Sequence, residues 1–156
     1  MANQAKQVYG TAQTCINSSV NVTAGNFSGT PLATFDNTTD TAAPYAPWGK
    51  ATLVIGQTPS APVVGTGWEL WGILKDVLST DDDTDAPAST VVGGARYFGF
   101  FAAAGSTTLQ RRTINISLLG VEKLDPYIKN GTAQQITSTT TNLFLSITPF
   151  TEMPST

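Results

Sequence analysis

Several stretches of the chain alternate apolar and polar residues with a period of two, and this pattern constrains the fold more than any other feature. Residues 113–118 read TINISL, and residues 143–150 read LFLSITPF. Successive side chains of a β-strand point to opposite faces, so each stretch predicts a strand with one buried face. No window shows a sustained 3.6-residue apolar period, which predicts little or no helix.

Four further stretches favour strands. Residues 68–74 (WELWGIL) and 96–101 (RYFGFF) are almost continuously apolar, which is typical of strands covered on both faces. Residues 50–56 (KATLVIG) and the N-terminal stretch VYGTAQTCINSSV alternate more weakly. All of these stretches predict the same class of structure, an antiparallel sheet.

Two local signals predict where strands end. Asn130-Gly131 is a strong turn sequence and predicts a hairpin. Pro149 cannot donate a hydrogen bond to a neighbouring strand, so it predicts an edge strand or a strand end.

The size of the chain fits one domain. It has 156 residues, is rich in Thr and Ser, and only 12% of its residues are charged. Thr fits a half-exposed pleated surface, so we expect an all-β fold, a single antiparallel β-sandwich with little or no helix. Its topology is jelly-roll or Ig-like, and the pattern does not separate the two. We assign residues 1–15 to an N-terminal arm or first strand and residues 16–156 to the sandwich, with an irregular loop at 25–49.

The composition argues against most chemistry. The chain has no His and one cysteine, Cys15, so it lacks the residues of Ser-His-Asp and Cys-His hydrolases and of most zinc sites. Its glutamates are isolated, and a glycosidase needs paired carboxylates in a cleft. We therefore predict no enzymatic activity and no cofactor.

Charge and hydropathy also bear on partners. The net charge is −3, and the cations are scattered apart from Arg111-Arg112, which argues against nucleic-acid binding. No stretch approaches the roughly 18 to 20 apolar residues of a membrane span, and the N-terminus does not resemble a secretion signal. We expect a soluble chain without membrane association.

An acidic stretch, DDDTD at residues 81–85, is the densest charge in the chain. It lacks the glycine and the distant Glu of a calcium-binding loop. We therefore predict no metal site and keep Asp81, Asp83 and Asp85 only as weak candidates. The stretch is expected to be the solvated tip of a hairpin that joins residues 68–74 to residues 96–101.

Contact residues are predicted from aromatic side chains in irregular segments. Tyr45 and Trp48 lie in a Pro-rich segment and are typical of interface anchors, although such aromatics also serve as stacking platforms in carbohydrate-binding modules. Arg111-Arg112 favours a strand-entry pair at a subunit or partner contact. The complete set of interface candidates is Tyr45, Trp48, Arg111, Arg112, Val8 and Tyr9.

The order of features from Trp68 onward resembles a known group of proteins. WELWGILK, an Asp-rich loop with Pro, GGARYFGFF, TTLQRRTINISLLGV, LDPYIKNGTAQQI and TNLFLSITPFTE follow one another. This order is similar to that of small β-sandwich virion proteins of tailed bacteriophages. Phe150 stands where that group usually has Tyr.

The resemblance implies a non-enzymatic decoration or cement protein that binds the outer surface of a phage capsid. It also implies synthesis in the host bacterial cytoplasm. Its partners would be the major capsid protein and itself, as a homo-oligomer such as a dimer or trimer. A tail or baseplate structural protein and a carbohydrate-binding β-sandwich module remain the alternatives. We expect residues 1–15 and the loop up to Trp48 to be the adhesive parts.

Overall fold

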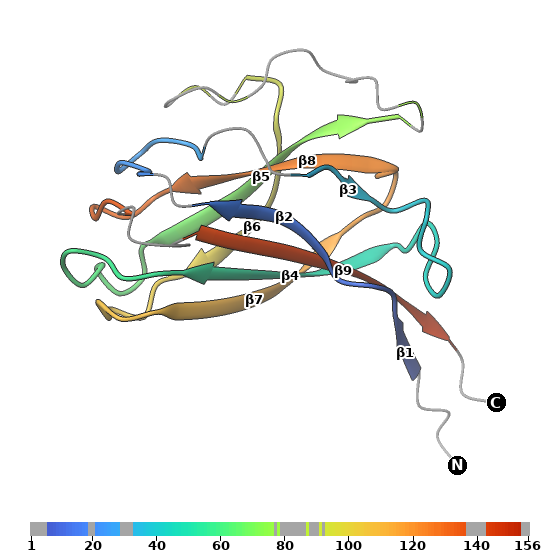
Figure 1. Ribbon diagram of the computed structural model, residues 1–156, viewed down its shortest axis with the longest axis horizontal. Helices are drawn as coiled ribbons and strands as arrows, with labels where there is room; N and C mark the ends of the chain where they lie inside the picture. Colours follow the sequence, from blue (N-terminus) through green and yellow to red (C-terminus); the bar gives the residue numbers. More distant parts are fainter. Residues whose placement is uncertain are drawn as a thin grey trace.

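The computed structural model describes residues 6–18, 21–28, 33–76, 78, 87, 91, 93–136 and 143–153, and these residues form strands and loops without a helix (Figure 1). The strands are β1 (Lys6–Tyr9), β2 (Gln13–Ser18), β3 (Phe35–Asp36), β4 (Trp48–Ile55), β5 (Gly67–Lys75), β6 (Arg96–Ala102), β7 (Gln110–Ser117), β8 (Lys123–Asn130) and β9 (Leu143–Met153). The all-β prediction is confirmed.

The strands form two antiparallel sheets. In the first, β7 pairs with β4 and β4 pairs with β9, while β1 and β2 share the other edge of β9. β2 pairs with residues 143–147 and β1 with residues 150–153. The second sheet has the order β3-β8-β5-β6. The N-terminal segment thus completes the first sheet, and the expected boundary at residue 15 falls inside β2.

The connections define the topology. From β2 onward every connection crosses between the two sheets, except for the β5–β6 hairpin. The resulting orders, β2-β9-β4-β7 and β3-β8-β5-β6, are those of an eight-stranded jelly roll, to which β1 is added. An Ig-like domain groups its strands differently, so the β-sandwich is of the jelly-roll type.

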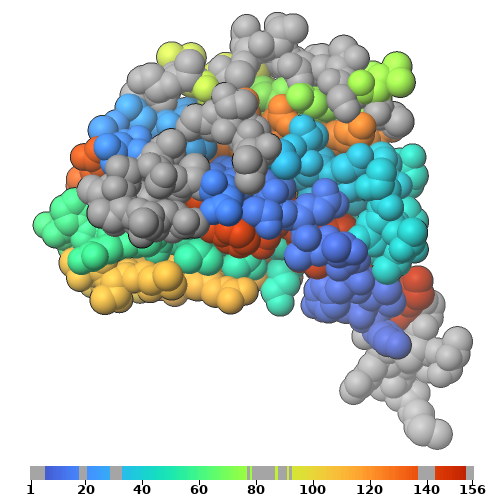
Figure 2. All heavy atoms as spheres, viewed as in Figure 1, coloured from blue at the N-terminus to red at the C-terminus, as the bar shows by residue number. Residues whose placement is uncertain are grey.

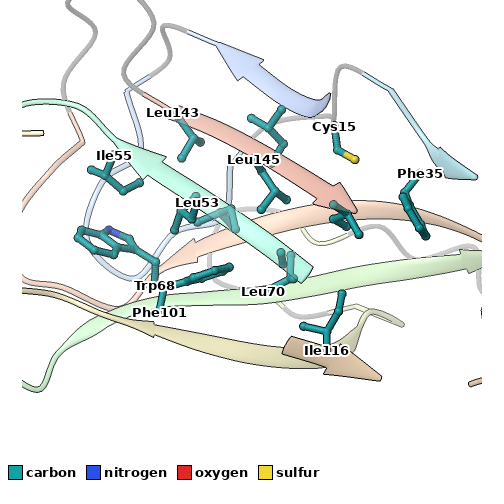
Figure 3. Close-up of a cluster of buried hydrophobic side chains, with 14 of the residues drawn as sticks. Cys15, Phe35, Leu53, Ile55, Trp68, Leu70, Phe101, Ile116, Leu143 and Leu145 are labelled. Atoms are coloured by element: carbon teal, nitrogen blue, oxygen red, sulfur yellow. The ribbon is translucent and has the colours of Figure 1, made fainter. Parts of the chain in front are cut away.

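The inward faces of the two sheets enclose one core. Leu143, Leu145 and Ile147 of β9 have no exposed surface, as their alternation predicts. Figure 3 shows Leu53 of the first sheet across from Trp68 of the second. Burying a side chain of this size contributes about 1.5–3 kcal/mol.

β5 is apolar on both faces because the second sheet also has a small cluster on its outer face. There Trp71 and Ile73 of β5 pack with Phe27 and Tyr127. The prediction of a strand covered on both faces is therefore confirmed for β5. It is wrong for β6, an edge strand in which Tyr97 is 49% exposed.

The hairpin predicted at Asn130-Gly131 is not present in the described residues, because residues 131–135 form no strand and Ile136 pairs with Val22 rather than with β8. Asn130 is instead fully buried. Its Nδ2 donates to the carbonyl oxygens of Val22 and Gln134, and its Oδ1 accepts from the backbone N–H and the hydroxyl of Thr132. Asn130 thus connects the segment around Val22 to the residues that follow β8, and it does not form a turn between two paired strands.

Pro149 lies in the interior of β9, a central strand, and not at the predicted edge or strand end. Its carbonyl oxygen accepts from the N–H of Gly10, in the junction between β1 and β2. The N–H and C=O of a strand residue point to the same neighbouring strand, so the N–H that proline lacks would also point into this junction. The ladder with the N-terminal segment is interrupted at that junction. The proline is tolerated because its missing donor falls in this gap.

Candidate contact surfaces

The loop that precedes β4 is fastened from inside by Asn37. This side chain is 1% exposed, and its Nδ2 donates to the carbonyl oxygens of Ala46 and Val121, both at 3.0 Å. The Asn37 carbonyl oxygen accepts from the N–H of Tyr45 at 2.7 Å. The described part of the expected irregular loop at 25–49, residues 25–28 and 33–49, is therefore held in place where it approaches β4. It also contains β3, and it ends where Trp48 begins β4.

Asp40 attaches the same loop to the N-terminal strands. Its carboxylate accepts from the backbone N–H groups of Thr11, Ala42 and Ala43. These N–H groups, that of Thr11 first, hold the pKa of Asp40 below its usual value. A Cβ at Gly10 would lie 2.6 Å from the carboxylate, so only glycine fits beside it. β1 and the loop of Tyr45 therefore form one surface, which Figure 2 shows as adjoining dark blue and cyan atoms.

Tyr45 is the most exposed aromatic residue of this end among the described residues. It is 61% exposed and has a φ of 49°, in the left-handed region that non-glycine residues seldom adopt. The hydrogen bond from its N–H to Asn37 helps to hold this backbone conformation. The ring is thus presented to solvent from a fixed backbone.

A hollow of about 270 Å³ lies beside Tyr45. Its lining includes Leu119, which is 61% exposed, together with the acidic residues Asp76 and Glu122 and the buried Asn37. No Lys or Arg is among the lining residues that the structure describes. The hollow is therefore partly apolar and carries negative charge.

A second surface is an aromatic row on the outer face of the first sheet. The register places Tyr9 of β1 beside Phe150 of β9, and Phe150 beside Trp48 of β4, so all three point outward. The rings of Tyr9 and Phe150 are 5.4 Å apart, and Lys50 Nζ lies 5.8 Å from the Tyr9 ring. Tyr9 is 45% and Trp48 41% exposed, whereas Phe150 lies buried between them.

The structure separates the remaining candidates from these aromatics. Val8 is half-buried and points away from the row, because it alternates with Tyr9. Arg111 and Arg112 lie near the start of β7, at the opposite end of the sheet from Trp48. Arg112 Nε donates to the Ala102 carbonyl oxygen at 2.8 Å, which joins β7 to β6 of the other sheet. Arg111 is exposed on the outer face.

An exposed apolar tip near Arg111 was missed from the sequence. Val63, Val64 and Leu109 are 64%, 75% and 65% exposed, on two loops that are joined by hydrogen bonds between their backbones. The only signal was the short apolar run between Pro62 and Gly65. It carries no strand or helix periodicity, so it indicates a loop but not its exposure.

Chemically reactive groups are few in the described part of the chain. No group of three or more His, Cys, Asp or Glu side chains is placed to hold a metal ion in the described ranges. Burial raises the pKa of Cys15 to about 12, so this thiol is protonated at neutral pH. The acidic stretch with Asp81, Asp83 and Asp85 lies outside the described residues. The described part of the chain contains no helix that is long and apolar enough to cross a membrane.

Comparison with known proteins gives no family for the chain. No protein-family model matches it, and no curated protein matches it with significant sequence similarity. A jelly roll alone does not specify a function, because the same frame serves viral capsid proteins, lectins and enzymes. The contact surfaces and their chemistry are therefore the basis for a functional assignment.

Proposed function

We propose that this chain is a structural virion protein that binds the outside of a bacteriophage capsid and stabilises the shell without catalysis. A protein of this kind binds the assembled lattice but not the loose subunits, so it shifts the equilibrium toward the assembled form. Repeated copies around the lattice add weak contacts into a strong attachment.

The observation that carries the proposal is the attachment of the Tyr45 loop to the N-terminal strands through Asp40. It unites the two segments that are weakly charged and expected to be adhesive into one end of the molecule. Tyr45 and Leu119 are exposed there beside the 270 Å³ hollow. An exposed aromatic residue on a fixed backbone next to a hollow is suited to protein contact, since little backbone freedom is lost on binding.

The fold and the sequence resemblance support the same assignment. Viral capsid proteins are among the proteins built on jelly rolls. The order of motifs from Trp68 onward resembles virion proteins, and the charged content of 12% is in keeping with a surface that is covered by neighbours.

The test is binding of purified protein to capsids of the phage that encodes it, prepared without this protein. Wild-type protein should bind stoichiometrically and raise the temperature at which the capsids break. Tyr45→Ala combined with Leu119→Asp should lower occupancy by about tenfold or more, since anchor residues of this kind contribute 2 kcal/mol or more.

Leu109→Asp is the matched control, because Leu109 is exposed to 65% against 61% for Leu119 but lies on the opposite tip. Unchanged occupancy of this control and loss with the Tyr45 and Leu119 variant would support the proposed surface. Loss with Leu109→Asp alone would move the contact to the other tip. Absence of wild-type protein from capsids would overturn the proposal, and a cryo-EM map of the virion would show directly whether the protein lies on the tail instead.

Carbohydrate binding is the second candidate, favoured by the composition of the hollow. Aromatic and carboxylate side chains, here Tyr45, Asp76 and Glu122, can stack on a sugar ring and accept hydrogen bonds from its hydroxyl groups. This function requires signals on a glycan array that disappear with Tyr45→Ala or Trp48→Ala. A negative array together with capsid binding would exclude it in favour of the structural role.

A further inference from the structure

We propose that the outer face of the sheet β1-β9-β4-β7 joins two copies of this chain in a two-fold symmetric dimer, centred on Tyr9, Phe150 and Trp48. The inference goes beyond the proposed function. It concerns a different surface from the Tyr45 hollow, and it can be tested without a capsid.

This face carries few charged residues. Residues at even positions of β4 and β9 point outward, because their odd-numbered neighbours fill the core. On β4, β7 and β9 the outward charged residues are Lys50, Arg111 and Glu152, and most of the others are Thr, Ser and Asn. Depletion of charge around exposed aromatic residues is typical of the centre of a protein interface.

The aromatic row supplies the centre of the contact. Tyr9 and Trp48 are both more than 40% exposed, and they flank Phe150 on neighbouring strands. A hollow of about 210 Å³ beside Trp48 is lined by Gln7, Asn115, Phe150 and Glu152. The hollow has room for an aromatic side chain from a second copy. Large rings contribute most of the free energy in such contacts.

Charge complementarity identifies the occupant as a second copy. Glu152 is two residues beyond Phe150 on β9, where it pairs with Gln7. Lys50 is two residues beyond Trp48 on β4, where it pairs with Thr148, on the other side of the row. Their Cα positions therefore lie about 7 Å from the row, in opposite directions along the strands, and the Lys50 side chain reaches back so that its Nζ lies 5.8 Å from the Tyr9 ring.

A two-fold axis along the row relates these two sides. When two faces meet about such an axis, Glu152 of each copy lies opposite Lys50 of the other copy. The aromatic row of one copy then meets that of the other. The face is thus self-complementary, which is the requirement for a closed two-fold contact.

The size of the face predicts a modest affinity. The row lies where β4 begins, so two copies related by an axis along the row overlap mainly between the positions of Lys50 and Glu152. Three strands about 4.8 Å apart and about 14 Å of strand length give a planar footprint of about 200 Å² per copy, which is typical of a weak, transient contact. The dimer should therefore dissociate on dilution.

The experiment is sedimentation velocity over a range of concentrations with Lys50→Glu, Glu152→Lys and wild-type protein. Wild type should shift from monomer to dimer as concentration rises. Each single variant should dimerise at least about tenfold more weakly, because two like-charged pairs then face each other. An equimolar mixture of the two variants should recover the wild-type dissociation constant to within about threefold, since both pairs become attractive again in the mixed dimer.

Arg96→Glu is the matched control, a charge reversal at an exposed position of β6 in the other sheet, and it should leave dimerisation unchanged. Each variant is also compared with wild type by circular dichroism and thermal melting, so a folding defect is recognised separately. Trp48→Ala removes an aromatic side chain of the row without changing charge, and it should also weaken dimerisation. A monomeric wild type, or a mixture no stronger than the single variants, would overturn the proposal. Capsid occupancy is measured independently, so failure of the dimer and failure of capsid binding are distinguishable.

Discussion

The carboxylate of Asp40 accepts a hydrogen bond from the backbone N–H of Thr11, 29 residues earlier in the chain. This contact joins the gap between β1 and β2 to the loop that carries Tyr45. The same gap faces Pro149, which has no N–H to offer there. The Asp40 carboxylate thus gives the Thr11 N–H a partner where the pairing of the N-terminal segment with β9 is interrupted. It also fixes the position of the loop that carries Tyr45.

Asp40→Asn should lower the free energy of unfolding by about 1–3 kcal/mol, because a neutral amide is a weaker acceptor and brings donors toward three N–H groups. Urea unfolding at pH 7 would measure the change. Thr41→Ala, an exposed neighbour in the same loop, is the control and should change stability by less than about 0.5 kcal/mol. Equal effects of both substitutions would show that the Asp40 contacts do not stabilise the fold.

The same carboxylate predicts a pH dependence. Since the pKa of Asp40 is lowered in the folded state, its contribution is fully present above the unfolded pKa of about 3.9 and is lost as pH falls through the lower folded value. Unfolding free energies of wild type at pH 7 and pH 3 should therefore differ by more than those of Asp40→Asn. An identical pH dependence for the two proteins would contradict this assignment.

Gln13 joins the two sheets at the opposite side of the sandwich from β6 and β7. Its Nε2 donates to the Asp36 carbonyl oxygen at 2.7 Å, and its Oε1 accepts from the Asp36 N–H at 2.8 Å. Gln13→Ala should cost about 1–3 kcal/mol of unfolding free energy, because both backbone groups lose their partner. Gln13→Glu should also lower the free energy of unfolding, since a carboxylate cannot donate to the carbonyl oxygen. Thr14→Ala, at an exposed position of the same strand, is the control and should leave the stability unchanged. Equal stability of the Gln13 and Thr14 variants in urea would contradict this role.

How much of this was predictable depends on how local the cause is. The alternation of Leu143, Leu145 and Ile147 specified a strand and its buried face, because both depend on neighbouring residues alone. The Asp40–Thr11 contact and the burial of Asn130 depend on distant segments, so their residue types indicated only turns. For the candidate surfaces, the sequence predicted individual residues but not their arrangement. Tyr9 and Trp48 were identified as single residues, but their alignment with Phe150 follows from strand order, which periodicity does not contain.

Cys15 gives a test of the core near β9. The side chain has no exposed surface and its pKa is raised to about 12, first by burial, so the thiolate that reacts with disulfide reagents is scarce in the native protein. At pH 8 the native thiol should react with an aromatic disulfide reagent at least about a hundredfold more slowly than the same thiol in denaturant, where its pKa returns to about 8.5. Release of the coloured thiolate, followed in buffer and in 6 M guanidinium at the same pH, measures both rates. If the native and unfolded proteins reacted at similar rates, β2 would not be packed on β9 as the structure shows, and the attachment of the N-terminal strands that supports both contact surfaces would be lost with it.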